Sequence, residues 1–253
     1  MSFSDHFSAV AASYARARPR YPRRWFRYLA RIAPDRQRVW DCATGNGQAA
    51  IALADDFSEV IGSDASAAQV RQARSHSRVQ YQVFPAEATP LPDASLDLIT
   101  VAQAAHWFDL PQFYAEAQRL LKPNGVIALW GYGLGSLNPD IDRVFDHFYR
   151  DWLDPYWPPE RQWVERAYQG LPFPFESLPV PAFSMQCDWT LFDFLAYLRT
   201  WSGVQQFQRQ RGFDPVWAIA PELQRVWGDP QRYRRITWPL FAKVGRWQPD
   251  RVR

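Results

Sequence analysis

Short apolar runs alternate with longer segments whose apolar residues recur every three or four positions through the first half of the chain. The short runs predict strands, and the helically spaced segments predict the helices that separate them. The predicted strands span residues 39–42, 59–63, 79–84, 96–102 and 126–130. Helices are expected to begin at Gly47, Ser66 and Pro111. This alternation is typical of a doubly wound α/β fold, a parallel sheet with helices on both faces.

Two further helices are predicted before the first strand. One covers residues 4–16, and the other follows Pro22, covers residues 23–33 and ends at Pro34. Proline suits the first position of a helix and cannot continue one, which explains both boundaries.

The pattern changes after Gly131. A helix over residues 139–153, a strand over 183–189, helices over 191–201 and 215–227 and a strand over 234–244 are predicted. Between the first two lies a segment, residues 154–181, that is rich in proline and aromatic residues. An insertion of this length is too long for a plain connection, so we interpret residues 132–182 as a lid. The alternative is a packed surface elaboration whose tryptophans are core residues.

A length of 253 residues suits one domain with a large core. We expect a single domain over residues 1–253 with four parts. These are an N-terminal helical cap (1–36), a ligand-binding core (37–131), the lid insertion (132–182) and a C-terminal part that completes the sheet with helices (183–253).

The most informative segment reads Val-Trp-Asp-Cys-Ala-Thr-Gly-Asn-Gly-Gln from Val39 to Gln48. Gly45 and Gly47 permit a tight turn and close approach of a ligand to the backbone, and the helix that follows presents N–H groups. The same glycines, with Ala50, match the dinucleotide fingerprint. The loop therefore predicts a nucleotide-like ligand without specifying which one.

Three acids stand after three successive predicted strands. Asp41 lies four residues before Gly45, where it can meet a cationic amino group but would repel a pyrophosphate. Asp64 follows the second strand, where a carboxylate can bind two ribose hydroxyls. Glu87 follows the third, where it can accept from an adenine amino group. Together they favour S-adenosylmethionine over NAD.

With these residues the chain resembles the class I S-adenosylmethionine-dependent methyltransferases over about residues 37–131. The family's glycine loop reads Asp-x-Gly-x-Gly-x-Gly, and here Ala43 replaces the first glycine, which limits how tightly the backbone turns. Further matches are Leu91-Pro92, Ser95 to Thr100, Gln103 to Asp109 and Leu120 to Gly125. The resemblance implies a mostly parallel, seven-stranded Rossmann-like sheet.

A looser resemblance spans nearly the whole chain. Tyr14-x-x-x-Arg18-Pro19-x-Tyr21-Pro22 and Thr200-Trp201-Ser202 are similar to the subgroup that includes the trans-aconitate methyltransferases. Tyr14 and Arg18 are then expected to fold over the cofactor, with Arg18 reaching its carboxylate. A solvated basic stretch formed by Arg16, Arg18 and Arg20 is the alternative.

The predicted cofactor is S-adenosylmethionine, with S-adenosylhomocysteine as its product. Its expected binding residues lie in the N-terminal segment, the glycine loop and the ends of strands two to four. They are Tyr14, Arg18, Asp41, Ala43, Gly45, Gly47, Asp64, Ala65, Gln69, Glu87, Ala88 and Gln103.

Methyl transfer depends mainly on alignment and exclusion of water, and a base is needed only when the acceptor must lose a proton. His106, at the end of the fourth strand, is the candidate base. The favoured alternative is that His106 shapes the cofactor pocket or packs beneath the lid. The expected acceptor is a small molecule that offers a carboxylate or a hydroxyl. A carboxylate needs no base, and Arg143, Arg150, Arg161 and Arg199 lie in and after the lid.

Composition narrows the remaining classes. The net charge is +3, which is too small and too scattered to indicate a nucleic-acid partner. No run of eighteen apolar residues and no signal-like start occur, so neither a membrane partner nor secretion is expected. The expected location is the cytoplasm. Cys42 and Cys187 lack metal-ligand spacing, and no metal is predicted. A non-catalytic S-adenosylmethionine-binding protein and an NAD-dependent oxidoreductase remain the alternative functions.

Overall fold

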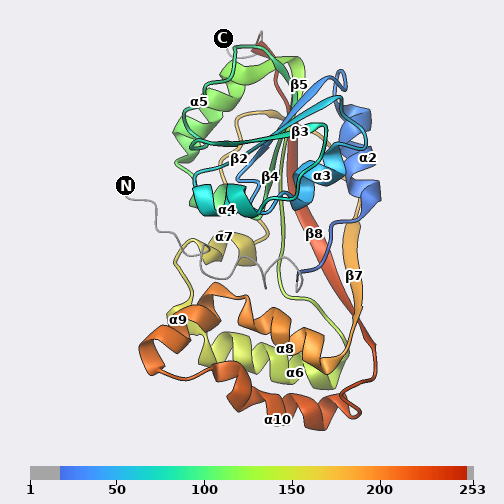
Figure 1. The fold of residues 1–253 in the computed structure, drawn as a ribbon, viewed down its shortest axis with the longest axis vertical. Coiled ribbons are helices and arrows are strands. Elements are labelled where there is room, and N and C mark those ends of the chain that lie inside the picture. Colours follow the sequence, from blue (N-terminus) through green and yellow to red (C-terminus); the bar gives the residue numbers. More distant parts are fainter. Residues whose placement is uncertain (1–17, 250–253) are drawn as a thin grey trace. The chain divides into compact units, whose positions relative to one another are not determined.

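The computed structural model describes residues 18–249 and divides the chain into two compact units (Figure 1). The sheet unit contains Tyr21–Gly133, Gln162–Phe183 and the chain from Leu240 onward. The helical unit contains residues 18–20, Leu134–Arg161 and Ser184–Pro239. The predicted helix over residues 4–16, with Tyr14, lies outside the described residues.

One mixed sheet organises the first unit. Its strands are β1 (Arg38–Cys42), β2 (Glu59–Asp64), β3 (Val79–Val83), β4 (Leu96–Ala102), β5 (Leu121–Tyr132), β6 (Glu176–Ser177), β7 (Phe183–Trp189) and β8 (Arg234–Arg246). The order is β3-β2-β1-β4-β5-β8-β6, and β7 also pairs with β8. β1 to β5 pair in parallel, as predicted. β8 is antiparallel to β5 and β6.

The sheet has eight strands where seven were expected, because the two-residue β6 adds a pairing partner for β8. The parallel pairs of the first half each need a crossover connection, and α3 (Gln48–Leu53), α4 (Ala67–Gln72) and α5 (Leu110–Leu120) lie in the connections after β1, β2 and β4. β8 arrives from the helical unit and needs no such crossover, so it joins β5 in the opposite direction.

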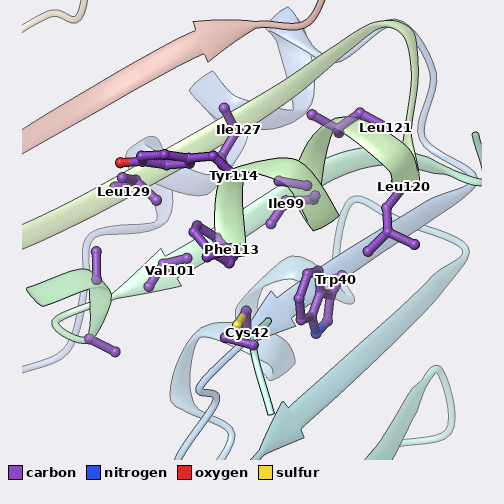
Figure 2. Packing of buried hydrophobic residues seen from close by; sticks show 14 of the residues in the cluster. Trp40, Cys42, Ile99, Val101, Phe113, Tyr114, Leu120, Leu121, Ile127 and Leu129 are labelled. Atoms are coloured by element: carbon purple, nitrogen blue, oxygen red, sulfur yellow. The ribbon is translucent and has the colours of Figure 1, made fainter. Parts of the chain in front are cut away.

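Successive residues of the central strands pack into two different cores. Trp40, Ile99 and Leu129 belong to one cluster, which α5 (Leu110–Leu120) covers with Phe113 and Tyr114 (Figure 2). The intervening strand residues join a second cluster with buried side chains of α2 (Arg23–Ile32) and α3 (Gln48–Leu53). Strand side chains alternate between faces, so both faces of the sheet are covered, as a doubly wound fold requires.

Most predicted helices begin and end within a few residues of the observed ones. The remaining helices are α6 (Pro139–His147), α7 (Arg161–Glu165), α8 (Leu191–Arg199), α9 (Ser202–Arg211) and α10 (Pro215–Trp227). The helix expected over 139–153 changes after His147 into a π-helical turn, Phe148–Trp152. α9 was not predicted, because its sequence is polar and only Gly203, Val204 and Phe207 are buried.

The residues predicted to form the lid divide between the two units. Leu134–Arg161 belongs to the helical unit, and Gln162–Phe183 belongs to the sheet unit. Within the sheet unit Tyr168, Leu171 and Phe175 are buried in the cluster beneath α5. Residues Gln162–Phe183 therefore match the alternative interpretation, a packed surface elaboration whose aromatic residues belong to the core.

Aromatic side chains form the core of the helical unit. Trp201 packs against Phe145, Tyr149, Trp157 and Tyr197, with ring centroids 5.4–5.7 Å apart. Much of the chain's tryptophan content in its second half is therefore explained by packing. Among residues 18–249, no helix is long and apolar enough to cross a bilayer.

Candidate active site

The glycine loop between β1 and α3 has left-handed backbone at three of its positions. Ala43, Gly45 and Gly47 have φ values of 53°, 56° and 80°. Glycine adopts this conformation without penalty, whereas Ala43 does so under strain. Among the described residues, only Gln69 Oε1, at 4.0 Å, lies near a Cβ built on Gly45, while a Cβ on Gly47 would overlap the Tyr81 hydroxyl. The side of the loop at Gly45 is thus open to a ligand, and the side at Gly47 is closed by Tyr81.

Asp41 lies at the end of β1 and is buried. One carboxylate oxygen accepts from the Thr44 hydroxyl at 2.6 Å and the other accepts from the Thr100 hydroxyl at 2.8 Å. Burial raises the pKa of Asp41 to about 6, although the two hydroxyls act in the opposite direction. Among the described residues, the donors to this carboxylate at the start of the glycine loop are neutral groups, so it would gain from a cationic neighbour.

Asp64 ends β2 and fastens the glycine loop. Its Oδ2 accepts from the Gly45 backbone N–H at 3.0 Å, and its Oδ1 accepts from the Ser66 backbone N–H at 2.9 Å. Each carboxylate oxygen can accept more than one hydrogen bond. Ser66 in turn caps α4 by accepting from the Gln69 N–H.

Glu87 follows β3 in a turn. Its Oε1 accepts from the backbone N–H of Asp109, the N-cap residue of α5, at 3.1 Å. This bond fixes Oε1 of Glu87 against the start of α5. The second carboxylate oxygen, Oε2, takes no part in this hydrogen bond. Ala65 and Ala88, also assigned to the cofactor, are exposed in the loops after β2 and β3.

The three predicted acids gather around a single residue. Burial raises the pKa of the Cys42 thiol well above its usual value, and the carboxylates of Asp41, Glu87 and Asp64 raise it further. The strand register agrees with this, because β1, β2 and β3 are neighbouring parallel strands and the three acids lie at or just after their carboxyl ends. Their combined negative charge favours a ligand that carries positive charge.

Gln103 follows β4 with left-handed backbone, at a φ of 57°. Its side-chain Nε2 donates to the Tyr132 carbonyl at 2.9 Å. Its Oε1 is buried and has no hydrogen-bond partner among the described residues. The hydrogen bond to the Tyr132 carbonyl fixes the orientation of the Gln103 amide. The Oε1 atom is then available as a hydrogen-bond acceptor.

His106 lies three residues beyond Gln103 and is partly exposed. Its Nδ1 is 3.3 Å from the hydroxyl of Tyr168, and its ring packs against Trp107. Tyr168 is fully buried and, like Ala167 before it, has positive φ. A strained, buried tyrosine thus orients the candidate base. The sequence did not reveal this pair, since the two residues are far apart along the chain.

Arg18 belongs to the helical unit. Its guanidinium donates to the Thr200 carbonyl at 3.3 Å and lies 5.5 Å from the centroid of the Tyr197 ring. It therefore packs beside Thr200-Trp201-Ser202, the other segment on which the subgroup resemblance depended. The carbonyl is at the C-terminal end of α8, where a cation is favourable.

Comparisons with known proteins agree with this geometry. Residues 40–129 match the family model described as "Methyltransferase domain". A presumed methyltransferase of Dictyostelium discoideum is 35% identical over 228 residues, which cover 88% of this chain and 85% of that protein. The chain belongs to the class I S-adenosylmethionine-dependent methyltransferases.

Two further relatives support this assignment. The solved structure of a presumed type II methyltransferase from Anaeromyxobacter dehalogenans is 47% identical in sequence to this chain and has a TM-score of 0.86. The match covers 92% of this chain and 99% of the Anaeromyxobacter chain. The ubiquinone/menaquinone biosynthesis C-methyltransferase of Rubrivivax gelatinosus is 37% identical over 130 residues, which is 47% of this chain and 51% of that enzyme. Family membership removes the basis for an NAD-dependent oxidoreductase.

Sequence reasoning missed several residues that shape this methyltransferase's site. Thr44 and Thr100 hold Asp41, Ser66 holds Asp64, and Tyr81 closes one side of the glycine loop. Thr44 lies three residues after Asp41, so a search for hydroxyls beside the acids could have found it, whereas Ser66 holds Asp64 through its backbone N–H. Within residues 18–249 no cluster of three or more histidine, cysteine or acidic residues could hold a metal ion.

Proposed function

We propose that this methyltransferase binds S-adenosylmethionine at the carboxyl ends of β1 to β4 and transfers its methyl group to a small molecule. The placement of Asp41, Asp64 and Glu87 at the carboxyl ends of three neighbouring parallel strands carries the proposal, because S-adenosylmethionine has a cationic sulfonium and a cationic amino group. NAD carries a pyrophosphate, which the same three carboxylates would repel.

The residues present fit this cofactor. The open side of Gly45 allows a ligand to approach the backbone, and the Asp64 carboxylate, which lies beside Gly45, would accept from the two ribose hydroxyls. Glu87 would accept from the adenine amino group, and Asp41 would lie toward the methionine amino group. Gln103 Oε1 offers a further acceptor, while Ala43, Ala65, Gln69 and Ala88 would line the adjacent loops. The proposed roles of Tyr14 and Arg18 over the cofactor rest on the subgroup resemblance.

When bound, S-adenosylmethionine supplies a methyl group that is transferred by in-line displacement. A lone pair of the acceptor forms the bond to the methyl carbon while the bond to sulfur breaks and its electron pair stays on sulfur. The protein's part is to hold the two reactants in line and to exclude water. For a hydroxyl acceptor, the proton would pass to His106.

We propose a carboxylate or hydroxyl acceptor, in keeping with the trans-aconitate subgroup. The structure reduces the arginines that could hold a carboxylate. Arg143, Arg150 and Arg199 form ion pairs with Asp140, Asp146 and Asp214. Arg161 makes no ion pair with the described residues.

The environment of Arg161 suits an anion. Its guanidinium lies 5.0 Å from the centroid of the Trp157 ring and donates through Nε to the Tyr149 hydroxyl at 2.9 Å. These contacts orient the guanidinium, and among the described residues no carboxylate pairs with it. A nucleic-acid or membrane partner is not proposed, and the proposed location is the cytoplasm.

Calorimetry with S-adenosylmethionine, S-adenosylhomocysteine and NAD tests the cofactor. We expect the first two to bind and NAD not to bind. Asp64→Ala should weaken S-adenosylhomocysteine binding by about 1.5–3 kcal/mol, the usual loss of hydrogen bonds to a charged group. Unchanged affinity in a folded Asp64→Ala variant would remove Asp64 from the site.

Labelled S-adenosylmethionine and a metabolite extract, followed by mass spectrometry, test the transfer itself. A labelled small molecule is expected. Tight cofactor binding without labelling of any extract component would favour the alternative, a non-catalytic S-adenosylmethionine-binding protein.

His106→Ala distinguishes the two acceptor classes. With a carboxylate acceptor, which we favour, activity should fall only in proportion to cofactor binding. With a hydroxyl acceptor, turnover at saturating cofactor should fall about 10²- to 10⁴-fold, the usual contribution of a general base. Turnover measured at saturating cofactor, beside the affinity for S-adenosylhomocysteine, separates these results.

A further inference from the structure

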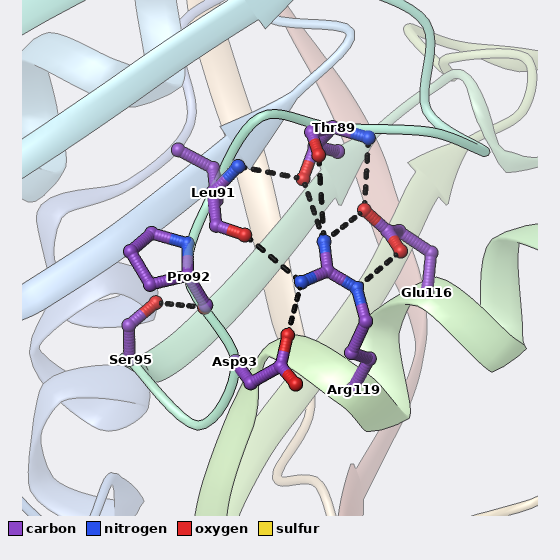
Figure 3. A network of polar contacts seen from close by, with 7 residues as sticks. All are labelled: Thr89, Leu91, Pro92, Asp93, Ser95, Glu116 and Arg119. Atoms are coloured by element: carbon purple, nitrogen blue, oxygen red, sulfur yellow. Dashed lines mark hydrogen bonds and ion pairs between the residues drawn. The ribbon is translucent and has the colours of Figure 1, made fainter.

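Arg119, near the end of α5, holds the loop that follows Glu87 (Figure 3). Its Nη1 donates to the Leu91 carbonyl at 2.9 Å and to the Asp93 carboxylate, and its Nη2 lies 3.4 Å from the Thr89 carbonyl and hydroxyl. One side chain therefore contacts three residues of the loop, two of them through their backbone.

Glu116, one turn earlier on α5, completes this arrangement. It accepts from Arg119 Nε at 2.8 Å and from Nη2 at 2.6 Å, which is a two-point contact between guanidinium and carboxylate. The same Glu116 accepts from the Thr89 backbone N–H at 2.8 Å. Hydrogen bonding to Arg119 also lowers the pKa of Glu116, so the pair stays charged.

The loop is thus tied to α5 at two places. The first is at the helix start, where the Asp109 N–H holds Glu87, and the second is two turns later, where Glu116 and Arg119 hold Thr89 and Leu91. Between Val83 and Leu96 the chain forms no strand or helix, so these polar contacts take the place of a backbone ladder. Only one residue separates Glu87 from Thr89.

We propose that Arg119 is a positioning residue for Glu87, and through it for recognition of the adenine amino group. The proposal rests on the proposed function, in which Glu87 reads adenine. In this role Arg119 acts through its contacts with the loop and does not need to touch the cofactor. Its contribution is to fix the direction in which the Glu87 carboxylate points.

Arg119→Lys is the informative substitution. It keeps the positive charge, but a single ammonium cannot reproduce the fork that spans Glu116, Thr89 and Leu91. The probes are S-adenosylhomocysteine and its inosine counterpart, in which a carbonyl oxygen replaces the adenine amino group. Wild-type protein should prefer S-adenosylhomocysteine by about tenfold or more, the discrimination expected of a charged hydrogen bond. Arg119→Lys should reduce that preference severalfold.

A double-mutant cycle with Glu87→Gln decides how Arg119 acts. If Arg119 works through Glu87, the double variant should lose no more preference than Glu87→Gln alone. Independent, additive losses, or an unchanged preference in Arg119→Lys, would overturn the proposal. Arg23→Lys is the matched control, since Arg23 pairs with Asp55 at an exposed position of the same unit.

Two safeguards keep the result decisive. If Arg119→Lys does not fold, Glu116→Gln removes the same two-point contact from the other side and enters the same cycle. Failure of wild-type protein to bind S-adenosylhomocysteine would refute the proposed function, whereas binding without dependence on Arg119 refutes only this inference.

Discussion

At the scale of single residues, the site combines charge with backbone strain. Asp41 is a buried carboxylate held by two hydroxyls, and Ala43 and Gln103 have left-handed backbone without being glycine. Each feature costs stability, and each lies where a ligand is proposed to bind. Such costs are commonly concentrated at functional sites.

Asp41 makes stability depend on pH in an unusual direction. Because burial raises its pKa from 3.8 to about 6, the folded state binds the proton more tightly than the unfolded state. The stabilisation by neutral Asp41 is complete below pH 3.8 and is lost as the pH rises through 6, a total of about 3 kcal/mol. The free energy of unfolding of wild type should therefore fall, relative to that of Asp41→Asn, as the pH rises from 4 to 6. Urea unfolding of both proteins at several pH values measures this, and parallel curves would contradict it.

The two loop glycines should respond differently to alanine. Both have positive φ, so both substitutions incur backbone strain of about 1–2 kcal/mol. Only Gly47→Ala also collides with Tyr81, which adds about 1–3 kcal/mol of overpacking. We expect Gly47→Ala to lose more stability and Gly45→Ala to lose more affinity for S-adenosylhomocysteine. Urea unfolding and calorimetry on both variants test this, and the reverse pattern would place the ligand elsewhere.

At the scale of elements, capping residues set where the helices begin. Asn138, Thr190 and Asp214 accept from backbone N–H groups at the starts of α6, α8 and α10. Proline follows directly at α6 and α10, which explains why these two starts could be read from the sequence. α9 begins after Trp201 without a side-chain cap and was missed.

The cap of α6 provides a test within the helical unit. Asn138 accepts from the N–H groups of Asp140 and Ile141, both at 3.1 Å. Asn138→Ala should lower the free energy of unfolding by about 1 kcal/mol, the usual value of such a cap. Asp140→Ala, an exposed change in the same helical turn, should cost less. Equal losses from the two variants would show that the cap contributes nothing specific.

At the scale of the whole molecule, the chain leaves the sheet unit after β5 and returns to it twice. Gln162–Phe183 packs into the sheet core, whereas Leu134–Arg161 belongs to the helical unit. We therefore propose the lid for the first of these segments together with the N-terminal residues.

Hydrogen exchange tests whether these segments respond to ligand. On addition of S-adenosylhomocysteine, exchange should slow in residues 134–161 and in the N-terminal segment, while β1, β4 and β5 change little. Exchange that slows only in the glycine loop would contradict the lid. A variant without residues 1–20 that folds and methylates normally would also count against it.

The sequence alone determined what depends on neighbours along the chain. Alternating strands and helices specified the parallel half of the sheet, and the position of Asp41, Asp64 and Glu87 after successive strands specified the sheet edge at which we propose the ligand. Parallel strands place their carboxyl ends at one edge, so spacing along the chain translates directly into proximity.

Only the tertiary structure decided what depends on contacts between distant segments. The antiparallel pairing of β8, the orientation of His106 by Tyr168 and the hold of Arg119 on Thr89 each join residues from different elements. Local pattern carries no information about such contacts, because they arise when the faces of the folded elements meet. For the same reason, burial of Asp41 against Thr100, and with it the raised pKa of Asp41, could be seen only once β1 and β4 lay side by side.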